Sequence, residues 1–129
     1  MEIIVGNMAG FCGGVSNAVE KAKQEIENMP NNIEIHCLGE LVHNQEVMKK
    51  LFDKGMKLIE DIEHGSDKVI IRAHGVTKDV YEKAKNKGIT LVDLTCKKVL
   101  KIHEMAETYA KKECYIFLIG DKKHPEVIG

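Results

Sequence analysis

The stretch Val69-Ile70-Ile71-Arg72-Ala73-His74-Gly75 carries the clearest information about the fold. It opens as an uninterrupted apolar run and closes on a histidine and a glycine. Continuous apolar runs, in contrast to alternating ones, are typical of strands that are buried on both faces of a parallel sheet. We therefore expect residues 68–73 to form such a strand, with His74 at its carboxyl end.

Similar runs occur on both sides of this stretch. Further strands are expected at residues 2–6, 33–38, 57–60, 90–94 and 115–119. Helical patterns lie between them, at residues 15–28, around 47–52, around 80–84 and at about 98–112. Gly55 and Gly88 follow the second and third helices, where a left-handed residue is commonly required. Strands that alternate with helices predict right-handed βαβ units and an α/β fold with a parallel sheet.

A weak internal repeat accompanies this pattern. Residues 46–59 resemble residues 79–92 at an offset of 33 positions, and each copy contains a helix, a glycine and a strand. The similarity fits a duplication or two generic helix–glycine–strand units equally well, so both explanations stay open.

The composition excludes several classes of protein. The 129 residues carry a net charge of −1, with 43% hydrophobic and 30% charged residues, so nucleic-acid binding has little support. No apolar run is long enough for a membrane span. The N-terminal apolar segment, residues 1–5, is too short and too acidic for a signal peptide. A cytoplasmic location is expected. The four cysteines are then expected to be thiols or metal ligands, and no CxxC pair occurs.

Residues that carry chemistry gather just beyond the expected strands. They are Cys12, His43, His74, Cys96 and His124. In a parallel sheet the carboxyl ends share one edge, where α/β proteins bind ligands. Taken singly, each cysteine would be interpreted as a buried thiol and each histidine as a surface imidazole. The presence of all five residues at one edge of the sheet favours a functional site there.

The local chemistry indicates what this site would bind. His43, His74 and His124 each precede an expected helix N-terminus, where free N–H groups and the helix dipole attract anions. Three imidazoles there suit a phosphate or diphosphate. Cys12 and Cys96 are soft ligands that suit an iron–sulfur cluster or zinc.

The other cysteines and histidines are expected to have structural or solvent-facing places. Cys37 should lie in the core, and Cys114 should lie at the opposite edge of the sheet, since it precedes its strand. His36, His64 and His103 are expected to face solvent or to pack partly.

Five motifs resemble one family from end to end of the chain. The family is that of 4-hydroxy-3-methylbut-2-enyl diphosphate reductase, the LytB type. The motifs are Ala9-Gly10-Phe11-Cys12-Gly13-Gly14-Val15, Leu38-Gly39-Glu40-Leu41-Val42-His43-Asn44, Ile71-Arg72-Ala73-His74-Gly75-Val76, Asp93-Leu94-Thr95-Cys96 and Gly120-Asp121-Lys122-Lys123-His124-Pro125-Glu126-Val127.

The resemblance implies a fold of three similar α/β domains around a central cavity. Residues 1–96 would form the first domain, and residues 97–129 would begin the second. Three cysteines of the family hold a 4Fe-4S cluster; Cys12 and Cys96 match the first two, and the third ligand would lie outside this chain.

The resemblance also implies roles in the reaction. His43, His74 and His124 match histidines that hold the diphosphate substrate, and Glu126 matches the acid that delivers protons. The family removes the substrate hydroxyl with two electrons and two protons, giving isopentenyl and dimethylallyl diphosphate. The electron donor would be a protein such as ferredoxin or flavodoxin.

Three departures from the family pattern affect these expectations. Gly13 stands where the family often has Phe, which opens space beside Cys12. Lys97-Lys98 replace the usual proline–aromatic pair after Cys96, which could alter the loop or the cluster potential. Family members also continue well beyond Gly129, so we expect a fragment that does not turn over alone. The alternative is a stand-alone zinc- or anion-binding module that uses Cys12, Cys96 and nearby histidines.

Overall fold

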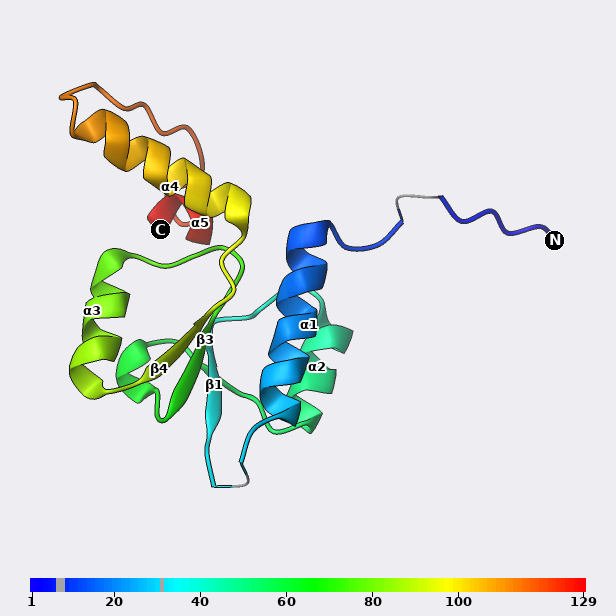
Figure 1. The fold of residues 1–129 in the computed structure, drawn as a ribbon. Helices are drawn as coiled ribbons and strands as arrows, with labels where there is room; N and C mark the ends of the chain where they lie inside the picture. Colours follow the sequence, from blue (N-terminus) through cyan, green and yellow to red (C-terminus); the bar gives the residue numbers. More distant parts are fainter. Residues whose placement is uncertain (7–8, 31) are drawn as a thin grey trace.

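A four-stranded parallel sheet lies at the centre of the chain (Figure 1). The computed structural model describes residues 1–6, 9–30 and 32–129. The strands follow the order β2-β1-β3-β4 across the sheet. They are β1 (Ile35–Leu38), β2 (Lys57–Ile59), β3 (Lys68–Ile71) and β4 (Thr90–Asp93). The α/β class and the parallel sheet expected from the sequence are confirmed.

Helices cover both faces of this sheet (Figure 1). On one face α1 (Gly13–Glu27) and α2 (Gln45–Asp53) pack over Ile35, Cys37 and Ile70. On the other face Leu38 and Val69 pack with Ala84 of α3 (Lys78–Lys87) and with the short 3-10 helix η1 (Ile62–His64). Successive residues of the central strands β1 and β3 are buried on opposite faces of the sheet, so the apolar runs of these two strands are continuous.

Two helices lie beyond the carboxyl ends of the strands (Figure 1). They are α4 (Lys97–Ala110) and the single turn α5 (Pro125–Ile128). Val99 is the buried residue of α4, and many of its other apolar side chains are exposed.

Local sequence signals mark where α2 and α3 begin and end. The Asn44 side chain accepts a hydrogen bond from the N–H of Val47 at 3.1 Å, which caps the first turn of α2. Gly55 and Gly88 follow α2 and α3 with φ of 101° and 70°, a backbone conformation that glycine adopts without steric cost.

The internal repeat corresponds to a structural repeat. In the sheet Leu38 pairs with Ile71, so residues paired between β1 and β3 are 33 positions apart, the same offset as in the sequence repeat. From this central pair, β1–α2–β2 runs outward in one direction and β3–α3–β4 in the other. The strand order therefore reverses between β1 and β3, the position where ligands bind in open α/β sheets.

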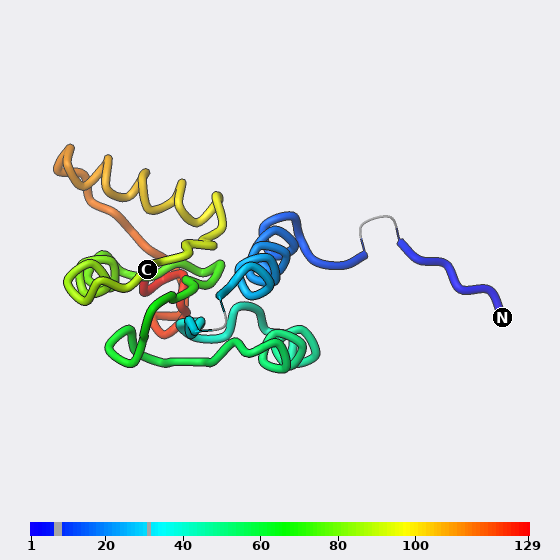
Figure 2. Tube along the Cα trace, turned by 60° about the horizontal axis from the view of Figure 1, so that its bottom comes forward, coloured from blue at the N-terminus to red at the C-terminus, as the bar shows by residue number. Residues whose placement is uncertain are grey.

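The strands expected at residues 2–6 and 115–119 are not formed. Both segments are extended and exposed, with Ile4 at 85% and Phe117 at 90% of full exposure. Residues 1–6 run away from the rest of the chain (Figure 2). A strand needs a neighbour for its N–H and C=O groups, and the described part of the chain pairs neither segment. The apolar, β-prone composition of both segments predicted strands. Composition alone does not show whether a neighbouring strand is present to pair with them.

This correction changes how two site residues are held. Cys12 and His124 do not follow strands; they are the N-cap residues of α1 and α5.

Across the described ranges, no helix is both long enough and apolar enough to pass through a bilayer.

Candidate functional site

Three imidazoles lie together at the point where the strand order reverses. His43 belongs to the loop after β1, His74 to the loop after β3, and His124 caps α5. The ring centroids of His43 and His74 are 5.3 Å apart, and those of His74 and His124 are 5.9 Å apart. Because β1 and β3 are neighbours, their loops bring His43 and His74 into contact range. The row of imidazoles expected from the sequence is thus present in space.

His74 lies in the middle of the row and is the most enclosed of the three. Desolvation lowers the pKa of His74, the charge of Arg72 lowers it further, and Glu126 opposes both. Its Nδ1 is buried and has no hydrogen-bond partner among the described residues. A buried polar atom without a partner is costly, so an acceptor brought by a ligand would satisfy it.

Neighbouring groups orient the two outer rings. The Glu40 carboxylate lies 3.4 Å from Nδ1 of His43. Nδ1 of His124 accepts the N–H of Glu126 at 3.3 Å, so in the neutral ring the hydrogen resides on Nε2. Both rings are exposed and leave Nε2 without an assigned hydrogen bond within the described residues.

The two expected ligand thiols meet around Gly14, close to the start of α1. A Cβ atom placed on Gly14 would lie 2.9 Å from Sγ of Cys96 and 4.0 Å from Sγ of Cys12. Cys96 is the N-cap of α4, and its N–H donates to the carbonyl of Ala73 at 2.9 Å. The backbone of Cys96 therefore lies beside the residue that precedes His74.

The environment of Cys12 favours its thiolate. The backbone N–H groups of Val15 and then Gly14 lower the pKa of the Cys12 thiol, and Lys98 adds a smaller effect in the same direction. Free N–H groups at a helix N-terminus stabilise a negative sulfur in this way. A thiolate is the form that binds soft metals.

A cavity of about 240 Å³ lies beside His43 and His74. Its walls come from the residues before and after Cys12 and from the loops after β1 and β3. They are Phe11, Val15, Leu41, Val42, His43, Ala73 and His74.

The loop that carries Cys96 has an anchor that the sequence did not reveal. Asp93 accepts hydrogen bonds from the N–H of Thr95 at 2.9 Å and from the hydroxyl of Tyr81 at 2.7 Å. Burial, followed by the Asp93 hydrogen bond, raises the pKa of Tyr81 to about 12. Asp93 and Thr95 belong to a quoted motif, but Tyr81 lies on α3 and no sequence pattern connects it to them.

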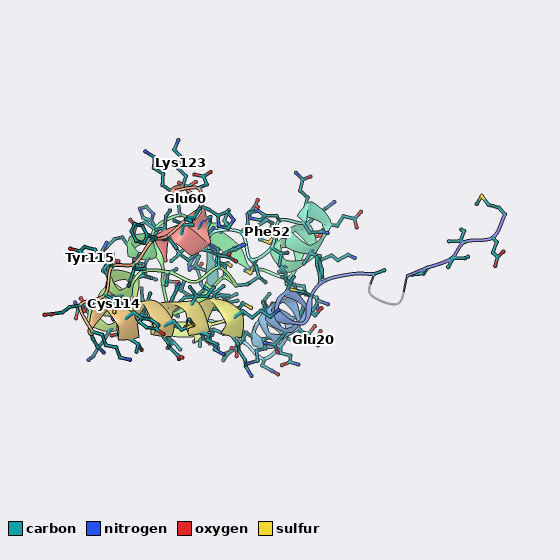
Figure 3. The ribbon with its side chains drawn as sticks, turned by 90° about the horizontal axis from the view of Figure 1, so that it is seen from above. Glu20, Phe52, Glu60, Cys114, Tyr115 and Lys123 are labelled. Carbon is teal, nitrogen blue, oxygen red and sulfur yellow. The ribbon has the colours of Figure 1, made fainter. Side chains whose placement is uncertain are left out.

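Of the two remaining cysteines, Cys37 lies where the sequence predicted and Cys114 does not. Cys37 is buried in the core, and desolvation raises the pKa of its thiol to about 12. Cys114 is exposed just past the far end of α4, which lies beyond the carboxyl ends of the strands, so the expectation that it would lie at the opposite edge of the sheet was wrong (Figures 1 and 3). That expectation depended on a strand at residues 115–119, which is not formed. Glu126 is exposed in the first turn of α5, near enough for its charge to act on His74.

The expectation for His36 was wrong. His36 is 6% exposed, and its Nδ1 accepts the N–H of Ser66 at 3.3 Å. It lies on β1 between two neighbouring strands, so the sheet buries it. His64 is exposed, and His103 packs partly against Gly75.

Within the described ranges, no group of three or more Cys, His, Asp or Glu side chains is arranged to hold a metal ion. The pair Cys12 and Cys96 is one residue short of such a group.

The sheet with its reversed strand order, the two thiols next to Gly14 and the imidazole row define an α/β protein whose candidate site lies at the carboxyl ends of its strands. Residues 3–129 match the family model of the LytB protein, so the chain belongs to the LytB family.

Proteins similar to this chain carry the same enzyme name. The 4-hydroxy-3-methylbut-2-enyl diphosphate reductase of Alkaliphilus oremlandii is 47% identical over the whole chain, which spans 46% of that protein. The solved structure of the corresponding reductase from Plasmodium falciparum has a TM-score of 0.86 and 38% identity, covering 95% of this chain and 39% of that one.

A second solved structure is of (E)-4-hydroxy-3-methyl-but-2-enyl diphosphate reductase, the terminal enzyme of the non-mevalonate pathway. Its TM-score is 0.84 with 32% identity, covering 98% of this chain and 45% of that one. The chain thus spans about half the length of the relatives that it matches.

Proposed function

We propose that this chain is the N-terminal part of a 4-hydroxy-3-methylbut-2-enyl diphosphate reductase. The enzyme would remove the allylic hydroxyl of its substrate with two electrons and two protons, giving isopentenyl and dimethylallyl diphosphate. The observation that carries the proposal is the row of three imidazoles together with two thiols that both lie next to Gly14. Family membership and the names of the relatives support it.

The imidazole row would bind the diphosphate group. Nε2–H of His124 can donate to a phosphate oxygen, and the unpartnered Nδ1 of His74 can donate to another. His43, with Glu40 against its other nitrogen, completes the row. A ligand that reaches all three rings would be held in one orientation, because the donors come from three separate segments of the chain.

The thiol pair would hold part of a 4Fe-4S cluster, with Cys12 and Cys96 as ligands and a third cysteine from outside this chain. When bound, the cluster supplies electrons singly and an open iron that acts as a Lewis acid toward the substrate hydroxyl. The residues present fit such a group, since the pKa of Cys12 is lowered and both sulfurs border one point in space. Electrons would come from a ferredoxin- or flavodoxin-like donor.

Glu126 would supply the proton that leaves with the hydroxyl group. It lies in the first turn of α5, and its charge already reaches His74 within the imidazole row. Hydroxide is a poor leaving group, so a positioned acid lowers the barrier to its departure.

We also propose a domain boundary between residues 96 and 97. Residues 35–93 form the whole sheet, while α4 and the segment after it add no strand within the described ranges. This arrangement is consistent with a first domain that ends near Cys96 and a second that begins with α4. We also propose a cytoplasmic location.

Anaerobic turnover of the substrate by the full gene product tests the activity. We expect the reconstituted protein to form both products with a chemical reductant, and Glu126→Gln to lose roughly 100-fold in kcat, as removal of a general acid does. Lys123→Gln is the matched control, because Lys123 is exposed nearby and projects outward (Figure 3). A protein that binds iron but forms neither product would contradict the proposed reaction.

A further inference from the structure

Gly14 has no backbone reason to be a glycine. It is the second residue of α1 and does not adopt the left-handed conformation that five other glycines of the chain adopt. Glycine is also a poor helix former, because it loses more conformational freedom on folding than other residues do. Any reason for glycine at this position must therefore come from its surroundings.

The surroundings of Gly14 are the two thiols. A Cβ at this position would lie 2.9 Å from Sγ and 3.7 Å from Cβ of Cys96, with Sγ of Cys12 at 4.0 Å. Carbon and sulfur do not approach to 2.9 Å without repulsion, because van der Waals contact between heavy atoms begins near about 3.5 Å. Gly13, one position earlier in the same helix, has nothing within 4 Å of its Cβ position.

The backbone at Cys96 has little freedom to move away. Its N–H is bonded to the carbonyl of Ala73, and the preceding Thr95 is held by Asp93. A methyl group on Gly14 would therefore be accommodated by rotation of the Cys96 side chain. That rotation moves Sγ of Cys96 away from the Gly14 side of the site and so changes its distance from Sγ of Cys12.

We propose that Gly14 is a positioning residue, whose missing side chain sets how closely the thiols of Cys12 and Cys96 approach each other. The proposal rests on the proposed function, in which both thiols are ligands of one cluster. Gly14 donates nothing to the metal; it acts through Cys96.

The test compares Gly14→Ala with Gly13→Ala in the full gene product. Both changes add one methyl group to the first turn of α1 and remove the same backbone freedom, so they differ in whether the methyl meets Cys96. The first measurement uses metal-free, reduced protein and phenylarsine oxide, which bridges two thiols that can approach each other. Mass spectrometry identifies the bridged peptides. The second is iron and sulfide content after anaerobic reconstitution.

We expect Gly14→Ala to bridge Cys12 to Cys96 more slowly and to retain roughly 10-fold less iron than the parent, as changes around metal ligands do. Gly13→Ala should match the parent in both measurements. Equal bridging and equal iron in the two variants would overturn the role of Gly14. So would a Gly14→Ala protein that loses its iron only because it unfolds, as seen by circular dichroism.

The two measurements also separate this proposal from the proposed function. If the parent protein takes up no iron, the proposed function fails, yet a difference in arsenical bridging between the two variants would still support the role of Gly14. If the parent takes up iron and Gly14→Ala takes up as much, the function stands and the role of Gly14 fails.

Discussion

At the scale of single residues, His74 is the imidazole of the row whose pKa is lowered by its surroundings. Its pKa is lowered by desolvation and by Arg72, so the ring is neutral in the free protein near pH 7. A bound anion would reverse part of this effect, because a negative charge favours the imidazolium form. Anion binding should then be accompanied by proton uptake at His74.

This coupling predicts how anion affinity depends on pH. Affinity for inorganic pyrophosphate should rise as pH falls from about 8 towards 6, and level off once His74 is protonated in the free protein. Calorimetry in buffers of different ionisation enthalpy measures the protons taken up. His74→Asn should take up fewer protons, while His64→Asn, at an exposed histidine outside the row, should behave as the parent does. Equal uptake in the parent and His74→Asn would refute the coupling.

Gly39 lies where there is no space for a side chain. Its φ is 75°, and a Cβ there would overlap the guanidinium of Arg72. We expect Gly39→Ala to lower the free energy of unfolding by about 1–3 kcal/mol through backbone strain and the displaced arginine. Urea denaturation measures the loss, with Gly13→Ala as control. A variant as stable as the parent would show that the loop after β1 adapts freely.

At the scale of elements, the anchor between α3 and the end of β4 holds the Cys96 loop. Tyr81→Phe removes the hydroxyl that donates to Asp93 and keeps the ring. The expected loss of unfolding free energy is about 0.5–1.5 kcal/mol, the usual net value of one hydrogen bond. Thermal and urea unfolding check it. Tyr109→Phe is the control, because the Tyr109 hydroxyl has no assigned hydrogen bond among the described residues. An unchanged stability would mean that the Asp93 contact is not maintained in solution.

Residues 115–119 form an exposed apolar segment between α4 and α5. Tyr115 is 94% and Phe117 is 90% exposed, and neither belongs to a helix or strand. Chymotrypsin should therefore cut the 129-residue chain here before it cuts within residues 35–93, because cleavage requires locally open backbone. First cuts within the sheet would contradict the arrangement of elements described above.

The elements also show which parts of the fold could be predicted from sequence. The four central strands and four longer helices were predicted because their signals are local: apolar runs, helical periodicity and glycines after helices. Residues 2–6 and 115–119 carry the same strand signal without a paired neighbour. His36 was misjudged for a related reason, since its burial depends on two strands that are distant in sequence.

At the scale of the whole molecule, the site joins segments from both ends of the chain. The sequence correctly predicted that His43, His74 and His124 would lie together, although His124 reaches the row from a helix cap and not from a strand end. The sequence did not predict Tyr81 as an anchor or the closeness of both thiols to Gly14, because these depend on three-dimensional packing. Two thiols cannot complete a cluster, so the account requires a further ligand.

The central claim is that Cys12 and Cys96 hold one 4Fe-4S cluster in the full gene product. Mössbauer spectroscopy after anaerobic reconstitution with iron and sulfide tests it most directly, with Cys96→Ser as the variant and Cys114→Ser as the control. The account predicts a four-iron cluster in the parent and in Cys114→Ser, and its loss or conversion to a smaller cluster in Cys96→Ser. A parent protein that binds zinc in place of iron, or a Cys96→Ser protein that keeps the same cluster, would contradict it.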